Sequence, residues 1–396
     1  MMPGEPLLQD PMVIFAFLAG VLAFIFWASG LPALKRVFDV TPPVIYAYFI
    51  PTLATTFGIT PMASPTYDWM KAYLLPLALF LLMVTIDLPA ILRLGKLAII
   101  MMLAGTLGIV LGGPIAFLAV GHWLPEGAWM GLAALSGSWI GGTANMTAIQ
   151  LSVGTPDAMM GPIIVVDTVV GYGWMGVLLF FTAFQKRFDA HVGARSDAMD
   201  GVMRHTEEEG RTQQPLDLRA AAIIVGLGFA VTVSAVILGR LGPAVGDPTV
   251  ISASTWGILI VVTGGLLLSF TPVRRIEDHG ASRVGYLALY LVLTAIGSGA
   301  DMAAVLAAPA FLLAGVIWIS VHILILYVAA RIFRAPLFFV ATGSMANVGG
   351  AASAPVVAGA YNPALAPVGL LMAVAGYILG IYAALACAWM LGVLGT

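Results

Sequence analysis

Charge is scarce in this sequence. Asp, Glu, Lys and Arg make up 9% of the 396 residues, whereas hydrophobic residues make up 61%. Soluble domains carry roughly 25% charged residues, so the composition excludes a soluble domain and predicts a multi-pass protein of the cell (inner) membrane, in contact with the lipid bilayer. The net charge of -2 argues against nucleic acid as a partner, because such a chain cannot neutralise a phosphate backbone.

Cysteine and nucleotide-binding motifs are also scarce. Cys387 is the only cysteine, which excludes an internal disulfide and a thiolate metal cluster. The sequence has no GxxxxGK[ST] loop to cradle the phosphates of ATP, so ATP-driven pumping is not expected of this chain. We therefore predict that the protein uses no cofactor.

Long apolar runs fill most of the chain instead. A membrane-spanning helix needs about 20 apolar residues. The first such run is preceded by Glu5 and Asp10 rather than by basic residues, which predicts a retained helix and not a signal peptide. Twelve runs are present, near residues 12–31, 41–60, 72–92, 96–121, 127–151, 160–184, 218–240, 251–270, 284–303, 308–333, 336–359 and 365–394.

One charged segment divides these runs into two sets of six. Residues 185–219 contain six basic and seven acidic side chains and too few apolar groups to enter a membrane, so we predict a solvated linker. The predicted fold class is an all-α polytopic membrane protein with two inverted repeats, residues 1–184 and 220–396, each of about five to six transmembrane helices.

Two polar, glycine-rich stretches interrupt the fifth run of each half. They are Ser136–Asn145 (SGSWIGGTAN) and Thr342–Gly350 (TGSMANVGG). Unpaired backbone amides at membrane depth are tolerated only where they face protein or water, and paired interrupted helices in a duplicated membrane protein are typical of secondary transporters. The sixth runs match too, because nine residues separate a proline from a Gly-Tyr pair in both, from Pro162 to Gly171-Tyr172 and from Pro367 to Gly376-Tyr377.

Basic side chains in short loops predict which ends of the helices face the cytoplasm. On this basis the fourth run starts inside and the tenth starts outside, as inverted repeats require. Three simple crossings from Lys96 would nevertheless place Lys186 outside. Either the linker is external, or one run of the first half does not cross fully. The basic loops used are Lys35-Arg36, Arg93 with Lys96, Arg274-Arg275 with Arg283, and Arg331 with Arg334.

Asp167 lies well inside the sixth run, soon after the first break. An unpaired carboxylate at the bilayer centre costs about 2.5–3.5 kcal/mol on insertion scales, so we expect it to face the interior and to bind a sodium ion or a proton. The alternative is a carboxylate that is hydrogen-bonded for packing alone.

The breaks add neutral ligands. Half-helices that end at mid-membrane carry partial charges that can hold an anionic group, and each asparagine amide offers an acceptor and two donors. The alternative is that Gly and Ser merely permit close helix packing. We predict an ion-coupling set of Asp167, Asn145 and Thr143, with sodium near Asp167, and a substrate-binding set of Asn347, Ser344, Gly349, Gly350, Gly141, Gly142 and Gln150.

Three further groups are accessory candidates. Asp87 and Asp301 end the third run of each half, where boundary carboxylates are often only solvated. His322 lies deep in an apolar run and could relay protons, although such a histidine more often bonds to a neighbouring helix.

An intramembrane protease is the alternative from another class. Gly297–Asp301 has one residue too many for the Gly-x-Gly-Asp motif of intramembrane aspartyl proteases, and the Tyr67-Asp68 pair falls in a loop. Ser136 with His322 lacks the Gly-x-Ser-Gly of serine proteases. We therefore predict that the protein is not an enzyme.

Three elements together resemble a bacterial and plant membrane-protein family known as domain of unknown function 819. They are Leu135–Asn145, Ser344–Pro355, and Pro367–Leu371 with Gly376–Gly380. The likeness extends over nearly the whole chain, and Ala-Asn-Val-Gly-Gly is its most specific part. That family is grouped with the cation/proton antiporter and anion transporter superfamily.

The resemblance implies a panel domain, about residues 1–95 and 220–305, and a core domain, about residues 96–184 and 306–396. In the core, two unwound helices would cross beside an ion site. Antiporters of the superfamily place the coupling carboxylate on the helix after the first unwound one, as with Asp167. They commonly pair two acids or Asn-Asp, whereas this chain has Val166-Asp167.

We therefore predict a secondary active transporter that couples sodium or proton movement to a small, anionic or polar organic solute. A homodimer through the panel runs is expected. A monovalent cation/proton antiporter is the alternative within transport.

Overall fold

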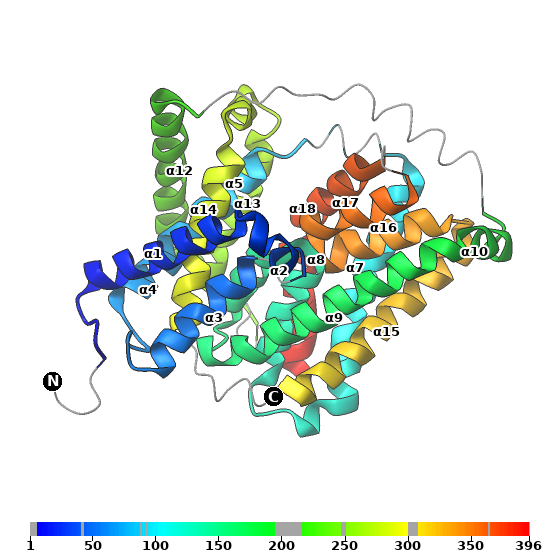
Figure 1. Ribbon diagram of the computed structural model, residues 1–396, viewed down its shortest axis with the longest axis horizontal. Helices are drawn as coiled ribbons and strands as arrows, with labels where there is room; N and C mark the ends of the chain where they lie inside the picture. Colours follow the sequence, from blue (N-terminus) through cyan, green and yellow to red (C-terminus); the bar gives the residue numbers. More distant parts are fainter. Residues whose placement is uncertain are drawn as a thin grey trace.

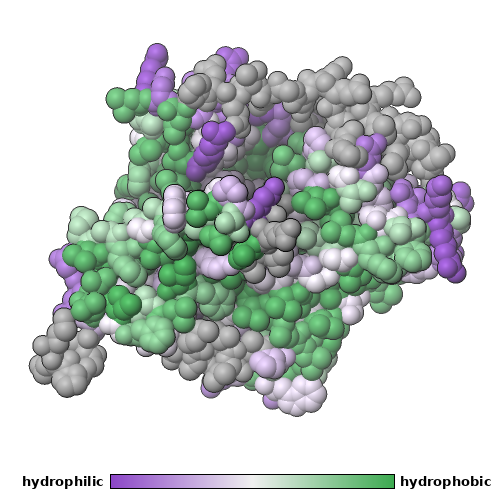
Figure 2. Space-filling model, in the orientation of Figure 1, coloured by the Kyte–Doolittle hydropathy of each residue, from purple (hydrophilic) through white to green (hydrophobic). Residues whose placement is uncertain are grey.

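The chain folds into helices that are apolar enough to lie in a membrane. A computed structural model describes residues 6–40, 43–87, 89, 91, 94–194, 216–246, 251–299, 308–362 and 365–395. Eight helices within these ranges are long and apolar enough to span a bilayer. Hydrophobic side chains cover much of the lower half of the molecular face in Figure 2, and hydrophilic ones stand out in its upper half and at its right margin. The prediction of a polytopic all-α membrane protein is confirmed.

The helices lie in two groups, side by side in Figure 1, and contact one another far more within a group than between groups. The α14 group holds α1 (Pro11–Ser29), α3 (Pro43–Thr56), α4 (Pro65–Trp69), the π-helix Met70–Leu74, α5 (Leu75–Val84), α12 (Leu218–Gly239), α13 (Ala253–Leu268) and α14 (Ala281–Ser298). The hairpin group holds α7 (Lys96–Val120), α8 (Ala128–Val153), α9 (Met160–Phe181), α15 (Ala308–Phe333), α16 (Leu337–Val348), α17 (Gly350–Tyr361) and α18 (Ala366–Gly395). Two short helices, α2 (Lys35–Val40) and α10 (Gln185–Val192), lie outside this division.

Helix α8 folds back on itself at its glycine pair. The backbone leaves the helical region at Gly141 and Gly142, and the φ of Gly142 is +76°. The Thr155 hydroxyl, just beyond the helix, donates to the Met130 carbonyl near its start across 3.0 Å. Each arm of this first hairpin holds about a dozen residues, roughly 18 Å of helix, which is too short to cross a membrane alone.

Helices α16 and α17 form the second hairpin. They have 12 residues each and meet at Gly349 and Gly350. The ring of Phe338, near the start of α16, packs edge-on against the ring of Tyr361 at the end of α17, with their centroids 5.7 Å apart. The base of this hairpin therefore lies at one end of the molecule and its glycine tip lies inside.

The two hairpins enter from opposite ends of α9. The base of the first hairpin adjoins Asp157, which precedes α9, whereas the base of the second is tied to Asp189 of α10, whose carboxylate accepts from the Leu337 N–H across 2.7 Å. The expectation of two unwound helices that cross is therefore wrong, because each break reverses the chain. A glycine pair permits a kink or a reversal equally, and the packing of the two arms selects the reversal.

This arrangement decides between the two alternatives for the linker. Because α8 returns to the end where it began, α7 and α9 are the two crossings that separate Lys96 from Lys186, and these two lysines lie at the same end. Arg331 of α15 donates to the His191 carbonyl of α10 there. We call this the basic end, to which Asp87 and its partner Arg274 also belong. We call the opposite end, with Lys71 and Asp157, the Lys71 end.

The charged segment 185–219 is not solvated throughout. Its first part forms α10, whose Val192 is 3% exposed and whose Asp189 binds the start of α16. Helix α12 already begins at Leu218, capped by the carboxylate of Asp217, which accepts from the Ala220 N–H across 2.7 Å. Residues 195–215 lie outside the described residues.

Alanine at either hairpin tip should destabilise the fold. Gly142 and Gly350 have φ values of +76° and +60°, a region that costs an L-residue about 1–2 kcal/mol. We expect Gly142→Ala and Gly350→Ala each to lower the free energy of unfolding by about that amount, measured by denaturant titration in detergent. The control is Gly173→Ala on α9, where an added Cβ would meet no atom within 4 Å. Equal stability of tip and control variants would contradict the reversal at these glycines.

Candidate functional site

The tips of the two hairpins touch each other. A Cβ built on Gly350 would lie 4.0 Å from the Cα of Gly142 and 3.9 Å from the hydroxyl oxygen of Tyr377. Each tip exposes a short stretch of backbone where the helical hydrogen bonding is interrupted. The N–H groups that begin the second arm of each hairpin have no partner one turn earlier in a helix.

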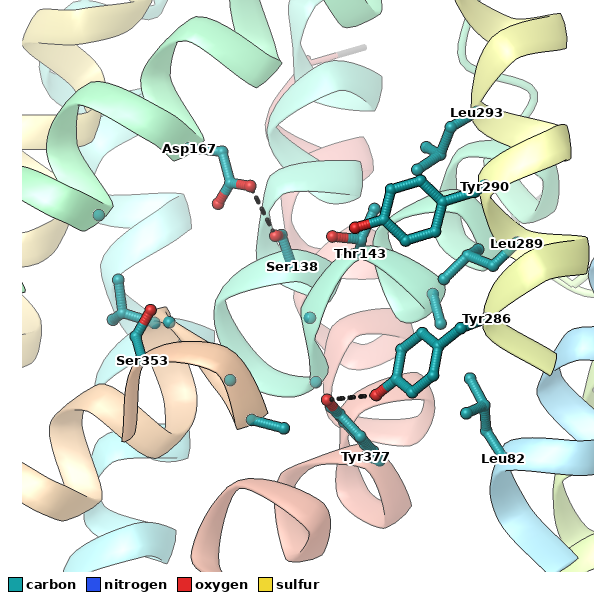
Figure 3. Close-up of a pocket in the computed structure, with 18 of the residues that line it drawn as sticks. Leu82, Ser138, Thr143, Asp167, Tyr286, Leu289, Tyr290, Leu293, Ser353 and Tyr377 are labelled. Atoms are coloured by element: carbon teal, nitrogen blue, oxygen red, sulfur yellow. Dashed lines mark hydrogen bonds between the residues drawn. The ribbon is translucent and has the colours of Figure 1, made fainter. Parts of the chain in front are cut away.

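A cavity of about 680 Å³ lies beside the tips, between the two helix groups. Figure 3 shows α14 on one side and the tips with α9 and α18 on the other. Six of the sequence-predicted residues line this cavity, five from the tips and one from α9: Gly141, Gly142, Thr143, Gly349, Gly350 and Asp167. Other lining residues are Ser138, Thr168, Tyr172, Arg283, Tyr286, Tyr290, Ser353 and Tyr377.

The cavity lies towards the basic end. It extends along α14 from Arg283 in the first turn to Leu293. Beyond that point the chain packs tightly against the hairpin group, because a Cβ on Gly299, just after α14, would lie 2.4 Å from a carboxylate oxygen of Asp157. The Lys71 end of the interface is therefore closed.

Asp167 is the acidic side chain among the described lining residues. Its carboxylate accepts a hydrogen bond of 2.9 Å from the Ser138 hydroxyl, which comes from the first arm of α8 (Figure 3). Ser138 is 3% exposed, so this bond orients the carboxylate from the buried side. A carboxylate with neutral oxygens nearby suits a hard cation such as sodium, or a proton.

Helix α14 contributes three groups that the sequence reasoning missed. Arg283, Tyr286 and Tyr290 follow one another at three and four positions along α14, so they share one face. In Figure 3 the rings of Tyr286 and Tyr290 point from α14 towards the hairpin tips. The helical spacing of Arg283, just before the apolar run 284–303, and of Tyr286 and Tyr290 within it is the signal that could have found them.

Two more tyrosines line the cavity at matching places in the two halves. Tyr172 and Tyr377 are the residues of the repeated Gly-Tyr pairs. The hydroxyl groups of Tyr377 and Tyr286 lie 3.3 Å apart, so this contact joins the hairpin group to the α14 group across the cavity. The repeated Gly-Tyr pair was visible in the sequence. The sequence did not show that both tyrosine rings line one cavity.

The two asparagines of the breaks do not line the cavity. The Asn145 amide donates to the Tyr377 carbonyl across 3.3 Å and lies against Gly141 and Gly380, where an added Cβ would lie 1.8 Å and 1.9 Å from its nitrogen. It therefore holds the first tip against α18. Its predicted contact with a coupling ion has no counterpart in this arrangement.

Asn347 is fully occupied by protein groups. Its amide donates to the Met102 and Gly343 carbonyls across 3.1 Å and 2.9 Å, and its oxygen accepts from the Thr106 hydroxyl across 2.8 Å. Asn347 is 0% exposed, so these bonds fix the second hairpin to α7 and the side chain does not reach the cavity.

Ser344 and His322 form a buried chain of hydrogen bonds outside the cavity. The Trp174 indole donates to the Ser344 hydroxyl across 2.8 Å. The hydroxyl lies 2.8 Å from His322 Nε2, and His322 Nδ1 lies 2.9 Å from the Gly105 carbonyl. Since a carbonyl only accepts, Nδ1 carries the proton and Nε2 accepts from Ser344. This series of hydrogen bonds ties α7, α9, α15 and α16 together. His322 thus bonds to neighbouring helices, which was the alternative to proton relay.

Ser136 and His322 do not meet. The Ser136 hydroxyl donates to the Ala133 carbonyl across 2.6 Å, and both ring nitrogens of His322 have other partners. The serine-protease pairing considered from the sequence is therefore not formed by these two residues.

Gln150 lies at the base of the first hairpin, away from the cavity. Its amide donates to Asp157 across 2.8 Å, and the same carboxylate accepts from Lys71 across 2.8 Å. Lys71 belongs to the π-helix of the α14 group, so this ion pair bridges the two helix groups at the Lys71 end. The side chains of Lys71 and Asp157 are 17% and 18% exposed.

Asp87, a further accessory candidate, does not line the cavity. Asp87 pairs with Arg274 at the basic end, within the α14 group. Asp301 lies outside the described residues. Within the residues that the structure covers, no three His, Cys, Asp or Glu side chains come together as a metal-binding group.

Comparison with known proteins places the chain in a family. Residues 16–394 match the family described as "Protein of unknown function (DUF819)". The chain belongs to this family. It is 27% identical over 389 residues to the "Uncharacterized membrane protein YjcL" of Bacillus subtilis (strain 168), a match that covers 94% of this chain and 95% of the relative.

Family membership confirms the resemblance found in the sequence. The match spans both halves of the chain and both glycine breaks. The description of the Bacillus relative as a membrane protein agrees with the eight candidate membrane helices. The protein is therefore a multi-pass membrane protein of the DUF819 family.

Proposed function

We propose that this protein is a secondary active transporter that couples the movement of sodium or protons to that of a small, anionic or polar organic solute. The observation that carries the proposal is the meeting of two hairpin tips and Asp167 at one cavity between two helix groups. A solute bound between two groups of helices is exposed alternately to either side when the groups move past each other.

Matched helix contacts support a duplicated, inverted architecture. Helix α3 packs on α14 as α13 packs on α5, α1 contacts α14 as α12 contacts α5, and α9 contacts α15 as α18 contacts α7. The hairpins occupy the fifth place in each half and enter from opposite ends. We propose repeats at about residues 1–184 and 220–396 with a linker between them, the α14 group as panel and the hairpin group as core.

The roles in the site follow from the chemistry of each group. Asp167 would take the coupling cation or proton, with Ser138 orienting it and Thr143 nearby. Backbone N–H groups at the hairpin tips would hold the anionic or polar part of the solute, as helix N-termini commonly do. Gly141, Gly142, Gly349 and Gly350 let a solute approach this backbone closely.

The proposal includes placement in the cation/proton antiporter and anion transporter superfamily. The division into two helix groups favours it, whereas the reversal at both breaks departs from the expected crossing helices. Clustering of basic side chains at one end favours a cytoplasmic basic end in the cell (inner) membrane. The proposal also includes a homodimer in which the α14 groups of two copies contact each other.

The proposal is tested with the purified protein in proteoliposomes. A mixture of labelled metabolites is offered with an inward sodium gradient, with an inward proton gradient, and with neither. We expect a small organic acid or polar solute to accumulate only with one of the gradients. Proton movement driven by a cation gradient with no organic solute present would instead favour cation/proton exchange, and absence of any gradient-driven flux would contradict transport.

A further inference from the structure

A buried polar cluster of Lys71, Gln150 and Asp157 joins the two helix groups at the Lys71 end. One carboxylate oxygen of Asp157 accepts from the Lys71 ammonium across 2.8 Å, and the other accepts from the Gln150 amide across 2.8 Å. Gln150 and Asp157 belong to the hairpin group, whereas Lys71 belongs to the α14 group. None of the three lines the cavity beside the hairpin tips, so the cluster is separate from the site of Asp167.

Gln150 has an acceptor atom without a donor. The side chain is 0% exposed, and its Oε1 atom has no hydrogen-bond partner among the residues that the structure describes. Buried side-chain oxygens are nearly always paired, so this one requires an explanation. Because Nε2 of the same amide donates to Asp157, Oε1 lies close to that carboxylate, and a carboxylate has no hydrogen to donate.

We propose that Asp157 is a second proton-binding residue, which takes up a proton from the solution at the Lys71 end when that end opens. The protonated carboxyl group would donate its O–H to Gln150 Oε1 and still accept from Gln150 Nε2, so the acid and the amide would make two hydrogen bonds to each other. The inference rests on the proposed function, because opening of this end belongs to the transport cycle.

Separation of the two helix groups affects the two charges of the ion pair differently. Lys71 would remain on the α14 group, where the exposed Asp68 precedes it by three positions, the spacing of neighbours on a helix. Asp157 would remain on the hairpin group with Gln150, which is neutral. A buried charge that has lost its partner is strongly unfavourable. A bound proton removes the charge of Asp157, and its release restores the ion pair when the end closes.

The surroundings of Asp157 favour a proton over a metal cation. Among the described residues, the titratable side chains that interact electrostatically with it are Lys71 of the π-helix, Asp68 of α4 and Tyr48 of α3. All three belong to the α14 group and would move away with it. A hard metal cation takes about six oxygen ligands, whereas the cluster keeps two side chains on the hairpin group. A proton needs one acceptor.

Acid is expected to open the Lys71 end. The bond that forms is an O–H bond on a carboxylate oxygen of Asp157, the proton comes from the adjoining water, and Lys71 stays protonated throughout. Protonation cancels the attraction between the carboxylate and the Lys71 ammonium, so low pH favours the open arrangement and higher pH favours the closed one. The proton at Asp157 thus gates this end, in contrast to the coupling ion at Asp167.

The first test is cysteine labelling of the purified full-length protein in detergent with a methanethiosulfonate reagent. Ser152→Cys places the reporter at the base of the first hairpin, where Ser152 is 3% exposed. Trp123→Cys, at a position that is 62% exposed at the same end, corrects for the effect of pH on the thiol itself. The ratio of the two labelling rates should rise on acidification by up to about tenfold per pH unit, the slope for one linked proton.

Asp157→Asn should abolish this response, because the amide is uncharged at every pH. The matched control is Asp87→Asn, which removes an acid from the other described ion pair of this kind, within the α14 group, and should keep the response.

Infrared difference spectra report the protonation directly. Acid should produce a carboxyl band that is missing in Asp157→Asn. In Lys71→Gln the band should appear at less acidic pH, because the ammonium that opposes protonation is gone. In Gln150→Leu the band should move to higher wavenumber, because the carboxyl C=O loses the hydrogen bond from Nε2.

The inference is overturned if the labelling ratio does not change with pH, if Asp157→Asn responds to acid as the parent protein does, or if no carboxyl band depends on Asp157. A response to sodium instead of acid would assign the cluster to a metal cation and would also overturn it. Circular dichroism and size-exclusion profiles show whether each variant is folded, and Lys71→Gln gives a second reading if Asp157→Asn is not. These measurements use no solute and no gradient, so their failure leaves the transporter proposal standing.

Discussion

Coupled uptake by the Asp167→Asn variant is expected to fall to the level of protein-free liposomes. Asp167 is the acid among the described lining residues of the cavity, and an amide neither binds a proton at this site nor balances the charge of a bound cation. The fold should survive, because the Asn oxygen can still accept the hydrogen bond that Ser138 now donates to the carboxylate across 2.9 Å. The measurement is gradient-driven solute uptake in proteoliposomes, normalised to inserted protein.

The matched control for this prediction is Asp278→Asn. Asp278 lies in the 3-10 helix Pro272–His279 at the basic end, beside Arg274 and Arg275 and outside the cavity. The variant removes the same charge and should transport normally. Ser138→Ala should give an intermediate result, a loss of about tenfold, because one hydrogen bond to a charged group is removed. Full coupled uptake by Asp167→Asn would refute the role of this carboxylate.

The helices were predictable because membrane helices depend on local composition. The run predicted at 96–121 is α7, Lys96–Val120, and the run at 218–240 is α12, Leu218–Gly239. Both glycine breaks were located as well, since the residues that permit left-handed backbone are few. The direction of the chain after each break was not predictable, because a reversal and a kink need the same glycines and differ only in which helices pack afterwards.

The candidate site was predictable in its backbone and less so in its side chains. The tip glycines and Asp167 lie in the middle of apolar runs, so the sequence predicted that they lie at mid-membrane depth, and all of them line the cavity. Asn145 and Asn347 do not line it, because they bind the Tyr377 and Met102 carbonyls. These partners lie more than 200 residues away in sequence, so the sequence alone did not reveal them. Arg283 was assigned to a loop because of its charge, yet it lies in the first turn of α14.

Closure of the Lys71 end rests on an ion pair between the two helix groups. Lys71 comes from the α14 group and Asp157 precedes α9 in the hairpin group, with 2.8 Å between nitrogen and oxygen. Gln150 donates to the other oxygen of the same carboxylate across 2.8 Å. If transport requires the groups to move past each other, this pair must separate in every cycle.

Locking that pair is expected to stop transport completely and reversibly. In the double variant Lys71→Cys/Asp157→Cys, a bifunctional methanethiosulfonate reagent would join the two groups at the Lys71 end, and a reductant would release them. Uptake should fall to background after cross-linking and return after reduction. The native Cys387 does not interfere, because it is 0% exposed and out of reach of the reagent.

The chain offers a matched control in its other described ion pair of the same kind. Asp87 and Arg274 are similarly buried, with 20% and 17% of their side chains exposed, but both belong to the α14 group. Cross-linking Asp87→Cys/Arg274→Cys therefore joins parts that do not move relative to each other, and uptake should be unchanged. Equal inhibition by both cross-links would show that rigidity in general is harmful, and continued uptake with the Lys71–Asp157 positions joined would refute movement between the groups at this end.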